Sequence, residues 1–307
     1  YPKKKNPIKN YFSIAKVVRD KGYKIVHRHT GSAISNIDLL AAKHGGAEIL
    51  ISHSHATQAG KKWLHYLARI IFRVKTEEFA CSKEAGRWLF GENDAENGKV
   101  QIIKNAINAE KYSYNSELRK KVREDHKIQD KFIVGHVGNF NEAKNHEFLI
   151  DVFYEIQKEN DNAVLWLIGN GKFRQNIEEK VENLDIKNKV IFEGERENVN
   201  EFMQGFDILI FPSVYEAFPI VLIEAQCAGL KCYVSKEAIP QEIDITGNLD
   251  FVSLEKDALF WGNIIIEDIK KKMNRNDGYL CIKNAGFDIR DAAKDLERRY
   301  LTYAGQK

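Results

Sequence analysis

The sequence has few cysteines and lacks any long apolar run. Its four cysteines, at positions 81, 227, 232 and 281, stand apart without the close pairing that zinc sites use. We therefore expect buried, unpaired thiols in a reducing cytoplasm rather than a zinc or disulfide framework. No apolar stretch reaches the roughly 18 residues that a membrane-spanning helix needs. The lysine-rich start leads into a polar segment, so no signal peptide is evident.

Charged residues of both signs are abundant but unevenly distributed. The 307 residues carry 47 Lys and Arg against 44 Asp and Glu, a net charge of +3. Residues 1–107 hold 19 basic and 9 acidic residues, whereas residues 108–307 hold 28 and 35. The basic first part predicts an anionic partner. A hydrophobic content of 43% is typical of a globular protein, and the length suits two domains or one large α/β domain.

Apolar runs and amphipathic segments alternate along the chain. The expected strands are 24–28, 48–53, 77–81, 100–103, 132–138, 163–168, 190–193, 207–211, 231–234 and 249–252. The expected helices are 33–44, 60–73, 83–90, 114–126, 145–159, 172–183, 197–204, 218–228, 255–273 and 289–303. This alternation predicts parallel sheets with helices on both faces, and a ligand site at the carboxyl ends of strands. A polar stretch near 105–113 predicts a domain boundary.

The most informative segment is 212–229, which holds Glu216 and Glu224 eight positions apart. It follows a buried strand, and a helix is expected over 218–228 with Pro219 in its first turn. Glu216 then lies on the loop after the strand, and Glu224 lies about two turns into the helix. The backbone N–H groups of 217–220 are expected to point out of the helix N-terminus. Together these groups suit a phosphate flanked by sugar hydroxyls.

The glutamate pair, the Pro-Ser before it and the Glu-Ala-Phe-Pro core resemble the signature of family 4 retaining glycosyltransferases, the glycosyl transferases group 1. The resemblance extends over nearly the whole chain from Lys24 and is similar to bacterial capsular and exopolysaccharide enzymes. It implies the GT-B fold, two Rossmann-like α/β domains whose parallel sheets face across a cleft. Residues 1–107 would be an acceptor-side domain that is incomplete at its N-terminus. Residues 108–288 would bind the nucleotide sugar, and the helix in 289–307 would cross back to the first domain.

The resemblance also implies roles within segment 212–229. Glu224 would bind ribose hydroxyls, and Glu216 would bind hydroxyls of the donor sugar. The backbone that would meet phosphate and sugar oxygens is that of Ala217, Phe218, Pro219 and Ile220. The alternative is a pair of solvated glutamates, one on a loop and one on a helix surface. The Asp-x-Asp metal motif of the other glycosyltransferase fold is absent, so neither a metal nor a cofactor is expected.

The loop after the strand at 132–138 contains a glycine, an amide and a lysine. Gly138 lets the backbone pass close to a ligand, and Asn145 is a good N-cap for the next helix. Lys144 matches a family lysine and is expected to reach the donor diphosphate, with a plain surface lysine as the alternative. Asn139 stands where the family has arginine, and an uncharged amide cannot neutralise a diphosphate. This departure predicts weaker or altered donor binding.

Two further strand ends resemble the donor side of the family. Gly169 and Gly171 bracket a turn that permits positive φ, although a plain tight turn is equally consistent. The third glycine of a dinucleotide fingerprint is absent, because position 174 is Arg. Phe192 and Glu193 lie where family members hold the nucleobase. For Phe192, ordinary core packing is the favoured interpretation.

Four histidines lie at the ends of two consecutive strands of the first part. His53 and His55 follow one strand, and His27 and His29 end the strand before it. The resemblance implies a histidine beside the reacting sugar and the acceptor, with His53 as the first candidate and His55 as the second. A hydrogen-bonded structural histidine is the alternative. Two histidines can also bind zinc, but no third or fourth ligand is evident nearby.

Residues 61–75 have the pattern of an amphipathic helix with a basic border. Trp63, Leu67 and Ile70 fall on its apolar face. Such a helix can touch an anionic membrane or a lipid diphosphate acceptor. The favoured interpretation is a helix whose apolar face packs against the core.

Together these features predict a cytoplasmic transferase of bacterial surface polysaccharide synthesis, with contact with the inner face of the membrane as a further option. It would move a hexose, with retained configuration, from a nucleotide diphosphate sugar, first of all a UDP sugar. The acceptor would be a saccharide or a polyprenyl-diphosphate-linked saccharide, and no nucleic acid is expected as a partner. Glu216, His53 and Lys144 are expected at the chemistry, through positioning and electrostatic stabilisation. The alternatives are a non-catalytic nucleotide-sugar-binding subunit and, less favoured, a sugar-nucleotide epimerase.

Overall fold

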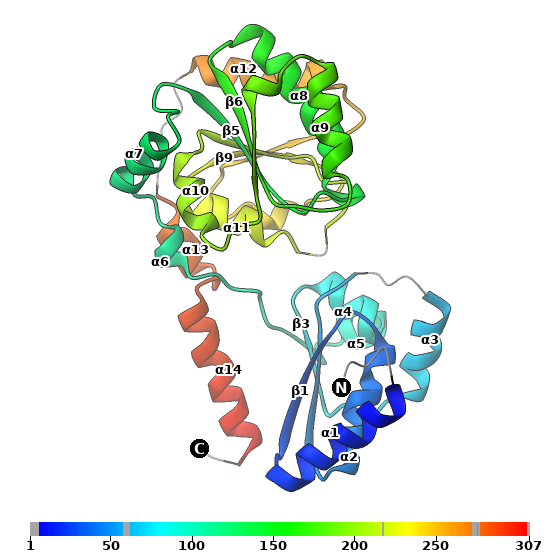
Figure 1. The fold of residues 1–307 in the computed structure, drawn as a ribbon. Helices are drawn as coiled ribbons and strands as arrows, with labels where there is room; N and C mark the ends of the chain where they lie inside the picture. The colour runs from blue at the N-terminus through cyan, green and yellow to red at the C-terminus, as the bar shows by residue number, and fades with distance from the viewer. Residues whose placement is uncertain (1–5, 58–61, 217, 272–274, 276, 306–307) are drawn as a thin grey trace. The chain divides into compact units, whose positions relative to one another are not determined.

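The computed structural model describes residues 6–57, 62–216, 218–271, 275 and 277–305. Figure 1 shows that the chain divides into two units. The first unit contains the residues up to Ala106 together with those from Arg290 onwards, and the second runs from Ile107 to Ile289. The long last helix, α14 (Ile289–Tyr303), therefore belongs to the first unit.

The first unit is built on a parallel sheet with the strand order β1-β2-β3-β4. Its strands are β1 (Ile25–Thr30), β2 (Ile49–Ser54), β3 (Glu77–Ala80) and β4 (Val100–Ile102). Its other helices are α1 (Pro7–Lys21), η1 (Ala33–Asn36), α2 (Ile37–His44), α3 (Lys62–Ile71), α4 (Lys83–Phe90) and α5 (Glu92–Glu96). Helix α14 is tied to this sheet, because Tyr300 hydrogen-bonds to His27 and Tyr303 to Gln101.

The second unit is built on a six-stranded parallel sheet with the order β10-β9-β8-β5-β6-β7. Its strands are β5 (Phe132–Val137), β6 (Ala163–Ile168), β7 (Val190–Gly194), β8 (Ile208–Phe211), β9 (Lys231–Ser235) and β10 (Leu249–Val252). Its helices are α6 (Ala109–Tyr112), α7 (Ser116–Asp125), η2 (Glu142–Lys144), α8 (His146–Glu159), α9 (Arg174–Asn183), η3 (Lys187–Lys189), α10 (Val199–Gly205), α11 (Ile220–Cys227), η4 (Gln241–Ile243), α12 (Ala258–Lys270) and α13 (Tyr279–Asn284).

Strand β6 shows why the strands of the second sheet could be predicted from the sequence. All of its residues are buried. Trp166 packs into the core on one face of the sheet, with Phe206. Leu165 packs into the core on the other face, with Phe153 and Trp261. A parallel strand that is covered on both faces needs apolar side chains at successive positions, which gives the continuous apolar run.

Local capping explains several boundaries that the sequence pattern placed wrongly. The predicted helix 114–126 is α7, which begins at Ser116 because Asn115 accepts a backbone N–H as its N-cap residue. The short helix α6, capped in the same way by Asn108, lies before the predicted range and was not predicted. The predicted helix 33–44 begins as the 3-10 turn η1 before α2. Helices α5 and α13 are short and were not predicted.

Of the four cysteines expected to be buried, Cys281 is exposed and the other three are buried.

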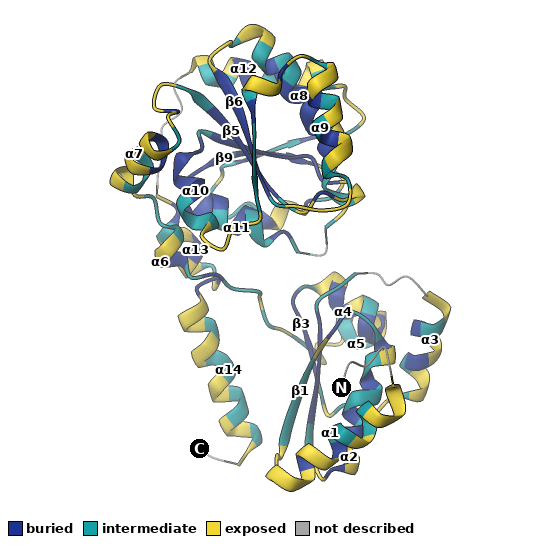
Figure 2. Ribbon diagram, in the orientation of Figure 1, coloured by how far each residue is buried: buried dark blue, intermediate teal, exposed yellow. Residues whose placement is uncertain are grey.

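Helix α3 does not pack its apolar face against the core, so the favoured interpretation of this segment is wrong. The side of the helix that is buried carries His65 and Ala68. Trp63 is 68% exposed and Ile70 is 66% exposed. Figure 2 shows α3 mostly in the colours of exposed and intermediate residues. None of the helices in the described ranges is both long and apolar enough to cross a membrane.

Replacing Gly135 with Ala should lower the free energy of unfolding by about 1–3 kcal/mol through overpacking. Gly135 lies in the central strand β5, and a Cβ atom there would stand 2.1 Å from the ring of the fully buried Phe206. Urea denaturation of the wild type and the variant measures the loss. As a control, Gly135→Ala combined with Phe206→Ala should cost less than the two single changes together. Simple additivity would contradict the contact.

Candidate active site

The strand order of the second sheet reverses at β5. From β5 the chain continues to β6 and β7 on one side, and then to β8, β9 and β10 on the other. The loops that leave β5 and β8 therefore diverge, and the space between them is the usual ligand position in a parallel α/β sheet. Gly138 and Lys144 belong to the loop after β5, and Glu216 belongs to the loop after β8.

Lys144 and Glu216 form an ion pair that joins these two loops. The Lys144 Nζ lies 2.6 Å from the Glu216 Oε1, and the side chains are only 16% and 12% exposed. The same Nζ lies 4.3 Å from the centre of the Phe211 ring. Partial burial strengthens the attraction but also makes the pair costly to desolvate. An incoming anion can therefore replace the carboxylate on the lysine and leave Glu216 free for another partner.

The helix after Glu216 starts later than the sequence pattern indicates. Helix α11 begins at Ile220 with Pro219 as its N-cap residue, so Glu224 lies just over one turn into the helix rather than two. Two members of the expected row of backbone donors are not available. Pro219 has no N–H, and the Ile220 N–H donates to the carbonyl of Phe218 at 3.0 Å. Ala217 lies outside the described residues.

The glycines of the loops after β5 and β6 allow two backbones to approach each other. A Cβ atom on Gly169 would stand 2.1 Å from the Gly138 carbonyl oxygen, and one on Gly171 would stand 2.5 Å from the Phe140 carbonyl oxygen. Gly169 also has a φ of 137°. The Gly138 N–H donates to the carbonyl of Ile168 at 2.9 Å. Contact between the loops thus explains these glycines without any ligand.

Asn139 lies in an open hollow between the same loops. The hollow is lined by Asn139, Phe140, Asn141, Asn170, Gly171, Lys172 and Glu195. Asn145 is the N-cap residue of α8, as expected, but it adopts the left-handed conformation and its side chain makes no capping bond. Its amide donates instead to the carbonyl of Pro212 at 3.2 Å, which fastens the loop after β5 to the end of β8.

Glu224 is held by a tyrosine that the sequence pattern did not single out. The Tyr112 hydroxyl, at the end of α6, donates to the Glu224 Oε1 at 2.7 Å. Burial raises the pKa of the Glu224 carboxyl above its ordinary value, and the hydrogen bond from Tyr112 partly offsets this effect. Glu224 is therefore not a solvated helix-surface glutamate but a half-buried carboxylate that accepts a hydrogen bond from Tyr112.

The two residues expected near a nucleobase make other contacts. The Glu193 carboxylate accepts from Trp166 Nε1 at 3.0 Å and from Arg196 Nη2 at 2.6 Å. Its side chain is thus already occupied. Phe192 packs against the core that contains Phe140, which matches the core-packing interpretation for this residue.

Two buried histidines beneath Lys144 were missed in the sequence. His136 on β5 lies with Nδ1 2.8 Å from the carbonyl oxygen of Ile210. His146 starts α8 and stacks on Phe140, with ring centres 4.0 Å apart. Burial, followed by the charge of Lys144, lowers the pKa of His146 to about 4. The signal was a histidine within an otherwise apolar strand, where a polar side chain needs a specific partner.

The four histidines of the first unit lie side by side, as their positions at the ends of two consecutive strands indicated. His29 on β1 is the register partner of His53 on β2. The rings of His27 and His53 are stacked with their centres 5.1 Å apart, and those of His53 and His55 lie 4.1 Å apart. The expectation that His53 and His55 lack a third metal ligand nearby is therefore wrong. The register of two neighbouring strands supplies it.

Comparisons with known proteins were consistent with this geometry. Residues 119–258 match the glycosyl transferases group 1. EpsF of Bacillus subtilis, assigned as a glycosyltransferase, is 32% identical over 85% of this chain and 70% of its own length. The Escherichia coli UDP-Gal:alpha-D-GlcNAc-diphosphoundecaprenol alpha-1,3-galactosyltransferase is 24% identical over 87% of this chain and 69% of its own. The crystal structure of Anabaena HepE in complex with UDP matches with a TM-score of 0.79 and 17% identity, over 95% of this chain and 82% of HepE.

The chain therefore belongs to the group 1 glycosyltransferases. Two parallel α/β sheets in one chain, together with the likeness to a glycosyltransferase structure over nearly the whole length, give it the GT-B fold. The predicted family, fold class and enzyme class are confirmed.

Replacing Glu224 with Gln should stabilise the ligand-free protein at neutral pH. Because the pKa of this carboxyl is raised by folding, the folded protein holds the proton more tightly than the unfolded chain. The free energy of unfolding of the wild type thus falls as the pH rises from the ordinary carboxyl pKa of 4.5 through the raised pKa of Glu224 in the folded protein. Urea unfolding should show a gain for Glu224→Gln at about pH 8 that disappears near pH 4.

The matched control for this prediction is Glu179→Gln. Glu179 is exposed on α9 and should show no such pH-dependent gain. An equal gain for Glu224→Gln at both pH values would contradict the burial of a charged carboxylate.

Proposed function

We propose that the protein transfers a hexose, with retained configuration, from a nucleotide diphosphate sugar to a saccharide or polyprenyl-diphosphate-linked acceptor in bacterial surface polysaccharide synthesis. A UDP sugar is the first candidate for the donor. The observation that carries the proposal is the Lys144–Glu216 pair at the reversal between β8 and β5. A cation suited to a diphosphate and a carboxylate suited to sugar hydroxyls meet there.

Donor binding would exchange this ion pair for two contacts with the substrate. Diphosphate oxygens would pair with the Lys144 ammonium group in place of Glu216. The released Glu216 carboxylate would accept hydrogen bonds from the donor sugar. Glu224 would accept from ribose hydroxyls, since a half-buried carboxylate with few donors gains by acquiring more. Each of these contacts positions the donor before the sugar–phosphate bond breaks.

Bond cleavage would place positive charge on the sugar ring and negative charge on the leaving diphosphate. Lys144 stabilises the second charge from a site that is largely shielded from water. The leaving phosphate accepts the acceptor's proton, so no protein base is assigned. His53 and His55 are proposed beside the acceptor on the strength of the family resemblance, and His53 would act as a neutral hydrogen-bonding group because burial lowers its pKa to about 2.

Asn139 in place of an arginine reduces the positive charge available to the diphosphate. A second lysine, Lys172, lines the same hollow as Asn139 and is 68% exposed. Its Nζ lies 3.4 Å from the Oε1 atom of the exposed Glu142. We therefore place Lys172 as the side chain that supplies part of the missing charge from the turn after β6.

Asn139 also favours a second candidate function, a non-catalytic nucleotide-sugar-binding subunit. Such a protein would bind the donor and show neither transfer nor slow donor hydrolysis. A sugar-nucleotide epimerase would interconvert the free nucleotide sugar without any acceptor, and the same assay detects this. The Escherichia coli relative is named for UDP-Gal and a diphosphoundecaprenol-linked sugar, and HepE was crystallised with UDP, which supports transfer from a UDP sugar.

A thermal-shift screen over UDP, GDP and ADP sugars tests the donor site. One nucleotide class, expected to be UDP, should raise the melting temperature of the wild type. Glu224→Ala should abolish the shift, and Lys144→Met should weaken donor binding by about tenfold or more through the loss of a charged hydrogen bond. Glu179→Ala, on the exposed surface of α9, is the control that should keep the full shift. A shift that survives Glu224→Ala would overturn the ribose assignment.

We also propose that α3 docks on an anionic membrane, which would bring a lipid-linked acceptor to the enzyme. Its apolar residues Trp63, Ile70 and Ile71 are 59% to 68% exposed. The basic residues Lys62, Arg69 and Arg73 border the same helix. An exposed apolar face with flanking positive charge is the combination that binds the surface of an anionic bilayer.

Sedimentation with phospholipid vesicles tests this surface. The protein should pellet with anionic vesicles at low salt and much less with neutral ones. Trp63→Ser combined with Ile70→Ser should weaken binding by about tenfold or more, because two exposed apolar side chains no longer enter the bilayer. Leu280→Ser removes a residue that is 65% exposed in the second unit and should change nothing. Equal loss in both variants would contradict docking by α3.

A further inference from the structure

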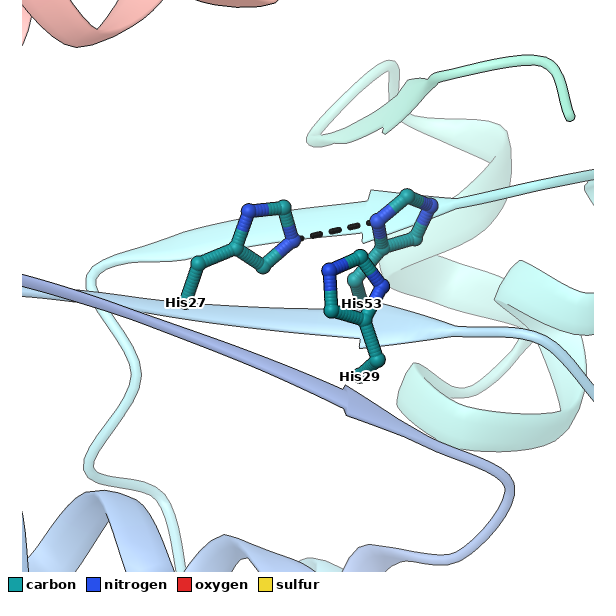
Figure 3. A group of neighbouring side chains, drawn as sticks. All are labelled: His27, His29 and His53. Atoms are coloured by element: carbon teal, nitrogen blue, oxygen red, sulfur yellow. Dashed lines mark hydrogen bonds between the residues drawn. The ribbon is translucent and has the colours of Figure 1, made fainter. Parts of the chain in front are cut away.

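Four histidines gather on one face of the first sheet. His27 and His29 lie on β1, His53 lies on β2, and His55 follows β2. Residues two apart on a strand share a face, and the pairing of His29 with His53 brings the two sets side by side. Figure 3 shows His27, His29 and His53 projecting from their strands toward one another.

Three of these side chains bring ring nitrogens close enough together to be candidate ligands of one metal ion. One ring nitrogen from each of His27, His29 and His53 lies within 4.8 Å of the other two. A tetrahedral zinc ion with bonds of about 2.0–2.1 Å separates two ligand nitrogens by about 3.3 Å. The His27 Nε2 is already 3.1 Å from the His53 Nδ1, and rotation of the His29 ring would bring its nitrogen to the same spacing.

Other ring nitrogens have the kind of partner that orients metal-binding histidines. The His27 Nδ1 lies 2.5 Å from the hydroxyl of Tyr300 on α14. The His29 Nδ1 lies 2.8 Å from the His55 Nε2. Such partners fix the orientation of a ring and decide which nitrogen carries the proton. They leave the Nε2 atoms of His27 and His29 available as ligands.

An apolar wall closes one side of this cluster. The edge of Phe79 packs against the rings of His27 and His53. Neutral imidazole is the form of histidine that binds a metal ion.

His53 is the most buried of the four histidines. It is only 4% exposed, and its Nδ1 faces the His27 Nε2 at 3.1 Å. A bound ion would give this nitrogen a ligand bond in place of the present hydrogen bond between two rings.

We propose that His27, His29 and His53 bind one divalent transition-metal ion such as Zn²⁺, with Tyr300 and His55 orienting the ligands. Three histidines leave a fourth coordination position for water or for His55. A set of nitrogen ligands favours Zn²⁺, Cu²⁺ or Ni²⁺ over Mg²⁺ and Ca²⁺, which prefer oxygen. The site goes beyond the proposed transfer reaction, which uses no metal. An ion bound here would hold His53 and so compete with the part assigned to it in transfer.

Titration of the EDTA-treated protein with Co²⁺ tests the site directly. Co²⁺ in place of Zn²⁺ should give visible absorption bands of a low-coordinate nitrogen site that saturate at one equivalent and disappear when Zn²⁺ is added. Mg²⁺ should neither give nor displace the signal. The absorption bands do not depend on sugar transfer. A failed donor-site experiment therefore does not count against the metal site, and missing absorption bands do not count against the donor site.

The histidine variants decide which residues hold the ion. His29→Ala changes an exposed residue and should weaken Co²⁺ binding by at least about tenfold, as should Tyr300→Phe to a smaller degree. His44→Gln, on the exposed end of α2, should bind like the wild type. Melting temperatures measured without metal show that each variant is folded. Absence of the bands in the wild type, or equal affinity of His29→Ala and the wild type, would overturn the proposal.

Discussion

The ion pair between Lys144 and Glu216 is the interaction on which the geometry of the donor side depends. It joins the loops that leave β5 and β8, the two strands between which the order of the sheet reverses. The amide of Asn145, which bonds to the carbonyl of Pro212, fastens the same two loops a second time. The topology of the sheet supplies the space, and the ion pair sets one positive and one negative group beside it.

Much of the second unit could be predicted because buried parallel strands and short motifs are local features. The run 207–211 and its Pro-Ser ending identified β8, and the residues around Glu216 identified the family. What the sequence could not supply were the partners. Lys144 lies 72 residues before Glu216, and Tyr112 lies 112 residues before Glu224. Contacts over such separations depend on the order of strands, which no local pattern encodes.

The first unit shows two other limits of reading a sequence. Counting metal ligands along one strand found His53 and His55 but missed the contribution of β1, because the register between strands is set by tertiary pairing. The amphipathic pattern of α3 established that one face is apolar but not what covers it. In the structure, the side of α3 that carries His65 and Ala68 is buried, whereas Trp63 and Ile70 are exposed. At α11, proline and local hydrogen bonding moved the helix start by two residues.

Because the first unit includes α14, the two units become complete at different stages of synthesis. Tyr300 and Tyr303 bond to residues 273 and 202 positions upstream, in the sheet that is made first. A ribosome releases the chain from its N-terminus, and domains generally fold as they emerge. The second unit can thus complete itself while translation continues, whereas the first must wait for the residues of α14. A chain released at residue 289 would hold every residue of the second unit but would lack the helix that bonds to the first sheet.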